Sequence, residues 1–226
     1  EVLSKSPKDF GIPRVRWDGV VLTEYLKRYH RITIHVRHAQ RWIRQLGYSL
    51  RQPIYRFAQA SQEGVKEFRS ELKKLRLAEK SGGRRILLFE DESGFSLHPK
   101  LGRVWIKKGT QPYVYTRSQH QKRLNLFGWV APAQGLHGMM KWARGNTDGF
   151  LRVLKSITVR FKGKIIDLWV DRARWHRGKR VENFQAANRH LHLHYLPAYH
   201  PELNYQETLW RTMRYEETTN AFFETI

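Results

Sequence analysis

The sequence predicts an α/β fold with a mixed sheet flanked by helices, preceded by a small all-α domain. Two apolar stripes at helical spacing lie in the first 58 residues, at 22–29 and 34–46. A long charged helix follows. From residue 84 onward, short apolar runs alternate with helical patterns, as expected of a sheet covered by helices. We therefore expect an all-α domain at 1–58, a helical linker at 59–83 and an α/β domain at 84–226.

The N-terminal domain is predicted to contain two helices joined by a tight turn. The first covers Leu22–Tyr29, and the second runs from Ile34 to Leu46 and ends at Gly47, a usual C-terminal stop. This arrangement is typical of a helix-turn-helix, whose second helix enters the major groove of DNA. Four residues of that helix are expected to face inward: Val36, Ala39, Ile43 and Leu46. Four are expected to face outward and to bind DNA: Arg37, His38, Arg41 and Arg44. A purely structural helical hairpin is the alternative.

The linker is expected to be one helix between Ser61 and Lys80. Its apolar residues form a single stripe: Val65, Phe68, Leu72 and Leu75. The stripe is too short for an independent coiled coil, so we expect the helix to pack on the α/β domain.

The α/β domain is expected to begin with meandering strands and to end with strands that cross over through helices. The expected strands cover residues 85–90, 103–107, 112–115, 123–130, 138–143, 164–170 and 191–196. The expected helices cover residues 147–161 and 178–188, and a last helix starts at Asn204. This order matches the ribonuclease H fold.

Three acidic residues lie where one predicted element passes to the next. Asp91 follows the apolar run 86–89, Asp171 follows the run 165–170, and Glu207 lies at the start of the last helix. Two strand ends and a helix start can meet at one point. Because hard divalent cations such as Mg²⁺ prefer carboxylate oxygens, this placement predicts a metal-dependent site for phosphodiester chemistry.

The charge balance predicts a polyanionic partner, and nucleic acid is the one we expect. The chain has 42 Lys+Arg against 20 Asp+Glu, a net charge of +22. Residues 93–147 contain no acid at all, which predicts a segment that follows phosphates. Within it, we expect six residues to hold a DNA strand: Arg103, Lys107, Lys108, Arg117, Lys122 and Arg123. A solvated basic face is the alternative.

The sequence also predicts where in the cell the protein is found. The chain has no cysteine, which fits a reducing cytosol and excludes cysteine-ligated zinc. No apolar run approaches a membrane span, and the N-terminus lacks the apolar core of a signal peptide. We expect a soluble intracellular protein, trimmed at both ends because it starts at Glu1 and stops soon after an acidic helix.

Three alternating histidines, His190, His192 and His194, would share one face of a strand. Such a set can bind metal. We favour a partly exposed strand face instead, because the sequence shows no acid or cysteine nearby to complete the ligands.

Four blocks in the α/β domain resemble, in the same order, those of mariner-superfamily transposases, and the bacterial insertion-sequence branch is the most similar. The blocks are Phe89–Phe95, Gly102–Trp105 with Gly109, Val170–His176, and Leu196–Asn204. The resemblance covers about residues 85–215.

The resemblance implies a catalytic DDE triad of Asp91, Asp171 and Glu207 that holds two Mg²⁺ ions, or Mn²⁺ in their place. It implies cleavage at transposon ends, followed by transfer of the 3′-hydroxyl into target DNA at TA sites. The expected partners are the terminal inverted repeats, target DNA and a second copy of the chain, in the bacterial cytoplasm at the nucleoid. His176 and Asn204 are expected just behind the triad. His176 could contact a substrate phosphate, orient Asp171, or make only a structural hydrogen bond.

Other interpretations stay open. Glu90 or Glu92 could be the ligand in place of Asp91, although strand alternation points both away from the side that Asp91 faces. Glu207 could belong to a capping box with Asn204, and Arg172 could pair with Asp171. For the whole chain, the alternatives are a catalytically silent, domesticated transposase that acts as a DNA-binding repressor, and a ribonuclease H-like nuclease that cuts without joining.

Overall fold

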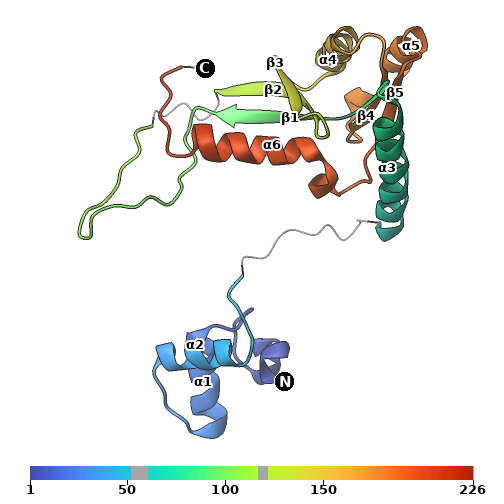
Figure 1. Cartoon of the computed structure of the whole chain (residues 1–226). Helices are drawn as coiled ribbons and strands as arrows, with labels where there is room; N and C mark the ends of the chain where they lie inside the picture. Colours follow the sequence, from blue (N-terminus) through green and yellow to red (C-terminus); the bar gives the residue numbers. More distant parts are fainter. Residues whose placement is uncertain (52–60, 117–121, 226) are drawn as a thin grey trace. The chain divides into compact units, whose positions relative to one another are not determined.

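The computed structural model describes residues 1–51, 61–116 and 122–225 (Figure 1). The chain divides into two compact units, Glu1–Tyr55 and Arg56–Ile226. The predicted boundary between residues 58 and 59 lies outside the described residues. The three-part division of the chain therefore stays a prediction.

The N-terminal unit is built on two helices, α1 (Gly19–His30) and α2 (Val36–Gln45). Helix α1 begins earlier than predicted because the Asp18 carboxylate accepts a hydrogen bond from the Val21 N–H and caps it. The helices approach closely at Gly19, where a Cβ atom would lie 2.7 Å from Gln40 Cγ. Their small core contains five buried residues: Ile12, Val21, Leu22, Tyr25 and Ala39.

The outer face of α2 is as predicted. All four basic side chains are exposed: Arg37, His38, Arg41 and Arg44. On the inner face, Ala39 is buried and Ile43 packs against the core, but Leu46 is 66 % exposed. The inward prediction for Leu46 is wrong because α2 ends at Gln45, so that Leu46 no longer follows the helical stripe.

The second unit contains one five-stranded sheet in the order β3-β2-β1-β4-β5. Its strands are β1 (Arg85–Ser96), β2 (Arg123–Ala131), β3 (Leu136–Lys141), β4 (Ile165–Val170) and β5 (Leu191–Tyr195). The first three run antiparallel, whereas β4 pairs parallel to β1 and β5 parallel to β4. The predicted mixed sheet, with a meander first and crossovers later, is confirmed.

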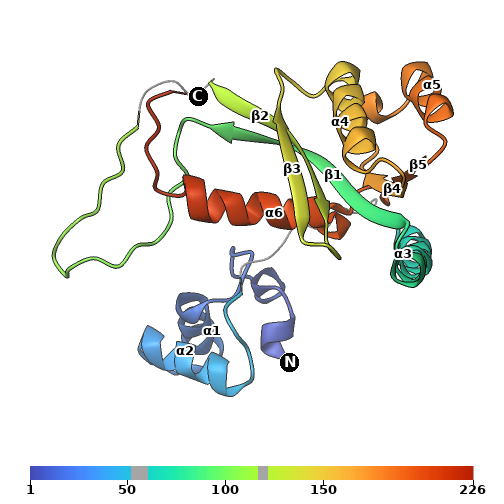
Figure 2. The ribbon, with the colours of Figure 1, turned by 45° about the horizontal axis from the view of Figure 1, so that its top comes forward.

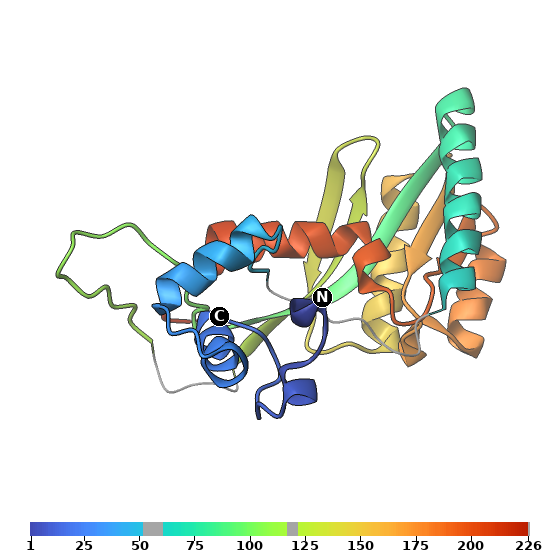
Figure 3. The ribbon, with the colours of Figure 1, turned by 90° about the horizontal axis from the view of Figure 1, so that it is seen from below.

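Helices cover both faces of this sheet. They are α3 (Gln62–Gly82), α4 (Thr147–Arg160), α5 (Lys179–Ala187) and α6 (Tyr205–Met213). Helices α4 and α5 lie on one side of the sheet and α3 and α6 on the other, where α6 contacts both β1 and β2 (Figures 1 and 3). Short 3-10 turns cover Val2–Ser4, Pro7–Phe10, Arg174–His176 and Pro201–Leu203, and a π-helical turn covers Arg214–Thr218.

Side-chain alternation along β1 assigns its residues to the two layers. Ile86 and Leu88 face the core under α4, whereas Leu87 and Phe89 face α3. The predicted stripe of α3 packs on this second core through Phe68 and Leu72, so the linker helix belongs to the α/β unit. The same alternation decides which way the acidic residues of β1 point.

Strand β1 continues past Asp91, contrary to the prediction that Asp91 ends the strand. Its pairing with β4 stops at Phe89, but its pairing with β2 continues from Asp91 opposite Gly128 to Ser96 opposite Arg123. Asp91 therefore lies where β1 loses one neighbour and keeps the other. At Asp91, the side of β1 that faced β4 therefore has no neighbouring strand.

The predicted hairpin strands at 103–107 and 112–115 are absent. Residues 101–116 form a long irregular loop that projects beside the C-terminal segment (Figure 2). The turn at its tip remains, with Gly109 at φ +84°. Val104, Trp105 and Ile106 are exposed, and a two-stranded ribbon without a packed face is marginal in water.

No helix among the described residues combines the length and apolar character needed to cross a bilayer.

Candidate active site

The three acids singled out from the sequence line one cavity of about 430 Å³. Asp91 comes from β1, Asp171 from the residue directly after β4, and Glu207 from the first turn of α6. Residues 196–201 form the remaining wall. The fold thus brings together side chains that are up to 116 positions apart.

Asp91 faces α6, and the pKa of its carboxyl group is raised. Its Oδ2 accepts a hydrogen bond of 3.1 Å from the indole N–H of Trp210, which is fully buried. Burial, followed by the negative charge of Glu207, raises the pKa of Asp91 to about 8. The part of this shift that comes from neighbouring carboxylates indicates that the cavity lacks positive charge to balance them.

Asp171 is held by two donors on the same oxygen. Its Oδ1 accepts from the Ala173 N–H at 2.8 Å and lies 2.8 Å from Nδ1 of His176. Burial raises the pKa of Asp171, but these hydrogen bonds outweigh it and lower the pKa below its usual value. The Asp171 side chain is half exposed, toward the cavity. The predicted pairing with Arg172 is not what the structure has, because Arg172 Nε donates to the carbonyl of Leu196 instead.

Glu207 is positioned by the cap of α6. Asn204 accepts from the Gln206 N–H at 3.1 Å through its side chain, and its Nδ2 donates to the carbonyl of Glu90. Asn204 therefore ties the start of α6 to β1. In a capping box Glu207 would accept from the Asn204 N–H, but that N–H donates to the carbonyl of Pro201. The capping-box interpretation of Glu207 is wrong.

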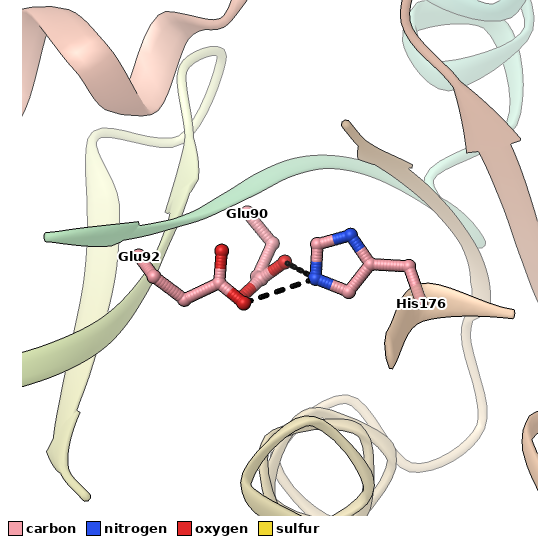
Figure 4. Close-up of side chains that lie close together, drawn as sticks. All are labelled: Glu90, Glu92 and His176. Carbon is pink, nitrogen blue, oxygen red and sulfur yellow. Dashed lines mark hydrogen bonds and ion pairs between the residues drawn. The ribbon is translucent and has the colours of Figure 1, made fainter. Parts of the chain in front are cut away.

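A second acidic group lies on the opposite face of β1 (Figure 4). Glu90 and Glu92 point toward His176, whose Nε2 is 3.1 Å from Glu92 Oε1 and 3.6 Å from Glu90 Oε2. The indole of Trp175 also donates to Glu92. Each residue of this group offers one ligand atom, and these atoms lie within 4.8 Å of one another. We call Glu90, Glu92 and His176 the buried cluster.

The buried cluster has strongly shifted pKa values. Burial, then the charge of Glu92, raises the pKa of Glu90 well above its usual range. Burial lowers the pKa of His176, but hydrogen bonds to Asp171 and Glu92 outweigh it and raise this pKa to about 11. A positively charged imidazole is the state that can donate to carboxylates from both ring nitrogens.

The donor set of the cavity fits a hard divalent cation. Three carboxylates from three elements line it, and Mg²⁺ and Mn²⁺ prefer oxygen ligands of this kind. Burial is the main cause of the raised pKa of Asp91, and the neighbouring carboxylates raise it further, a contribution that a bound cation would relieve.

The alternating histidines have acidic neighbours that the sequence did not reveal. His194 lies 3.0 Å from Asp167 and 2.8 Å from Glu71, and Asp167 also pairs with Arg85. His194 stacks on Trp169, whereas His192 is exposed and His190 precedes β5. Among the described residues the buried cluster is the group found able to hold a metal, and these histidines do not belong to it.

A larger basic cavity of about 940 Å³ adjoins the catalytic one. The two share Pro201, Asn204 and Glu207. Four cationic residues line this cavity, Lys100, Arg103, Arg211 and Arg214, against three acidic ones, Glu202, Glu207 and Glu216. Its rim is fixed by Asn220, whose side chain exchanges hydrogen bonds with the backbone of Gly102.

The other residues predicted to hold DNA are exposed where the structure describes them. These are Arg103, Lys107, Lys108, Lys122 and Arg123. Arg117 lies outside the described residues. Of this group, Arg103 alone lines the basic cavity, and the role of all of them stays a prediction.

Several residues near the site were missed from the sequence. Trp210 lies three positions after Glu207, so helical spacing could have indicated that both face the same way. Glu90 and Glu92 were correctly expected to point away from Asp91, but their contact with His176 was not foreseen. Lys100, Arg211 and Arg214 are separated in sequence and meet only in the fold.

A ribonuclease H-like mixed sheet with carboxylates from two neighbouring strands and a following helix defines a class of protein, the nucleases and polynucleotidyl transferases that act on phosphodiesters. The chain belongs to the DDE superfamily of endonucleases, whose model matches residues 86–226. A winged helix-turn-helix model matches residues 13–72.

A curated relative supports this assignment. The chain is 26% identical, over 229 aligned residues, to an uncharacterized 39 kDa protein of insertion element IS630 from Shigella sonnei. The match covers 97% of this chain and 63% of the relative, so the chain spans less than two thirds of that protein.

Solved structures agree on the fold. The crystal structure of a pre-cleavage Mos1 transpososome matches with a TM-score of 0.60 and 14% identity, over 95% of this chain and 69% of that one. The Mos1 mariner paired end complex with Mn matches with the same TM-score, identity and coverage. The predicted ribonuclease H-like fold and helix-turn-helix region are confirmed, as is the resemblance to mariner-superfamily transposases of the insertion-sequence branch.

Proposed function

We propose that this chain carries the DNA cleavage and strand-transfer activity of an insertion-sequence transposase. The observation that carries the proposal is the meeting of Asp91, Asp171 and Glu207 on one cavity beside a cationic one. The family to which the chain belongs and the similarity to an insertion-element protein support it.

The roles follow from the chemistry of the carboxylates. The charges of Glu207 and Asp171 both act on Asp91. Asp91 would therefore contact two Mg²⁺ ions, while Asp171 and Glu207 would each contact one, with Mn²⁺ as a substitute. Bound cations of this kind activate the attacking oxygen and stabilise the leaving one. The chain itself orients the carboxylates: Trp210 holds Asp91, the Ala173 N–H holds Asp171, and the Asn204 cap holds the helix of Glu207.

The cationic cavity supplies a binding surface for the DNA strand. Lys100, Arg103, Arg211 and Arg214 surround a space that shares Glu207 with the catalytic cavity. A phosphate backbone held there would bring the neighbouring phosphodiester toward the carboxylates. Of the expected DNA contacts, Arg103 is the one supported by this position.

The further details rest on the resemblance. The substrate would be double-stranded DNA with terminal inverted repeats, and the target would be a TA site. A transposase must hold two ends together, which favours a homodimer. Similarity to a bacterial insertion-element protein favours the bacterial cytoplasm, at the nucleoid, as the place of action.

The alternative is a silent, domesticated transposase that binds DNA as a repressor. The helix-turn-helix region would serve both functions. A third reading is a nuclease that cuts without joining. Intact carboxylates in the cavity favour an active enzyme over a repressor.

An assay with labelled element ends, a supercoiled target plasmid and Mg²⁺ separates these functions. The expected products are 3′-hydroxyl ends and labelled DNA joined to the plasmid. Binding without cleavage would instead support the repressor, and cleavage without joining the nuclease. Either result would contradict the proposed transposase.

DNA recognition is tested on helix α2. Replacing Arg41 with alanine is expected to weaken binding to the element ends by about 1–3 kcal/mol if Arg41 reads a base. The loss should then be larger for the specific sequence than for random DNA. Binding to both sequences is measured by fluorescence anisotropy at fixed salt, because phosphate contacts depend on ionic strength.

The matched control for Arg41 is Lys27→Ala, which removes one exposed cation from α1. It should lower affinity for both sequences equally and weakly. If Arg41→Ala and Lys27→Ala have the same effect, α2 is not the recognition helix.

A further inference from the structure

The buried cluster links Asp171 to strand β1, which carries Asp91, through the side chain of His176. His176 is fully buried and uses both ring nitrogens. Nδ1 lies 2.8 Å from Asp171 Oδ1, and Nε2 lies 3.1 Å from Glu92 Oε1. Glu90 and Glu92 flank Asp91 along β1, so His176 links the strand that carries Asp91 to the carboxylate of Asp171.

The pattern of contacts on Asp171 has a direct consequence for ligand geometry. Both donors, His176 and the Ala173 N–H, bind the same oxygen, Oδ1. Among the described residues, these hydrogen bonds go to Oδ1 and none goes to the other oxygen, Oδ2, and Asp171 lines the cavity. A ligand whose orientation is locked in this way loses less freedom when it binds a cation.

His176 is itself held tightly. Its ring lies 4.3 Å from the ring of Phe150 in α4. Tyr195 donates to its backbone carbonyl, and Trp175, the preceding residue, donates to Glu92. The position of the imidazole is therefore set by contacts with three elements, β1, α4 and β5.

We infer that His176 is a positioning residue that aims Asp171 Oδ2 into the catalytic cavity, and that Glu90 and Glu92, which flank Asp91 on β1, hold its imidazole ring in place. This inference rests on the proposed function, because it concerns the binding of divalent cations by the same carboxylates. Glu90 and Glu92 then act through His176, from the opposite face of the sheet.

Two substitutions separate the two ring nitrogens of His176. The side-chain amide of asparagine reaches about the position of Nδ1, so His176→Asn can still donate to Asp171. The amide of glutamine reaches about the position of Nε2, so His176→Gln keeps the contact with Glu92 and loses the one with Asp171. The pair thus differs in the interaction that the inference requires.

The measurement is direct binding of Mn²⁺, followed by electron paramagnetic resonance on the full chain without DNA. His176→Gln is expected to weaken Mn²⁺ binding about 10- to 100-fold, and His176→Asn by no more than about threefold. End binding should be unchanged in both, and thermal melting reports whether each variant folds. If either variant fails to fold, Glu92→Gln tests the same chain of contacts from the other ring nitrogen of His176. It is expected to weaken Mn²⁺ binding less than Asp171→Asn does.

Three outcomes overturn the inference. Equal losses in His176→Asn and His176→Gln would show that the contact with Asp171 is not what matters, and unchanged binding in both would show that no positioning is needed. Loss of Mn²⁺ binding in Glu92→Gln as complete as in Asp171→Asn would make the buried cluster itself the metal site. If instead Asp91→Asn and Asp171→Asn both leave Mn²⁺ binding intact, the proposed function fails, and the failure is distinguishable from that of His176 alone.

Discussion

Replacing Asp91 or Asp171 with asparagine is expected to lower the rate of DNA cleavage by at least about a thousandfold, roughly 4 kcal/mol in the activation free energy. Asparagine keeps the shape of the side chain and an acceptor oxygen. It removes the negative charge that a divalent cation requires. Cleavage of labelled element ends with Mg²⁺ is the measurement, and end binding should stay within about twofold because the basic surfaces are untouched.

The Asp91 variant should also melt no lower than the parent chain. Burial and the charge of Glu207 raise the pKa of Asp91 to about 8, so the ionised carboxylate is unfavourable in the folded state at neutral pH. Asparagine is neutral, so the variant avoids this cost. Loss of activity without loss of thermal stability therefore distinguishes a chemical role from a structural one.

Asp148→Asn is the matched control for these variants. Asp148 is an exposed aspartate at the start of α4, paired with Arg180 on the surface. It should leave cleavage unchanged. Retained cleavage in Asp91→Asn or in Asp171→Asn would reject the assignment of that residue to the triad.

The Gly128→Val substitution is expected to displace helix α6 and to destabilise the chain by about 1–3 kcal/mol. Gly128 lies on β2 directly opposite Asp91. A Cβ atom there would lie 2.5 Å from Trp210 Cη2 and 2.6 Å from Gln206 Nε2, both in fully buried side chains. Because α6 carries Glu207, its displacement should lower cleavage by more than the loss of folded protein explains.

Thermal melting and cleavage, measured at a temperature where the variant is folded, test this expectation. Gly94→Val is the control on the adjacent strand, where a Cβ atom would meet the side chain of Asn125 at 3.3 Å and that of Arg123 at 3.6 Å. Those surface side chains can move. If Gly128→Val keeps full cleavage while folded, the packing of α6 on β2 does not set the position of Glu207.

Much of the fold could be predicted because helices and strands show as periodic patterns of apolar residues in the sequence. Alternation along β1 assigned Glu90 and Glu92 to the face opposite Asp91, and the helical stripe of α3 identified the residues that pack on the sheet. The loop at 101–116 was predicted wrongly for the same reason. Its apolar residues have strand-like spacing, but they have no face to pack on, and periodicity cannot report that.

The sequence by itself determined which residues are candidates for the site, since a carboxylate after a buried strand or at a helix start is visible from local pattern. Only the tertiary structure decided which of them share a cavity and what holds them there. Trp210 reaches Asp91, and His176 joins Asp171 to Glu92, across separations of up to 119 positions. Contacts at such distances depend on strand order and crossover direction, which no local pattern encodes. These also leave β1 without a neighbouring strand on the β4 side at Asp91.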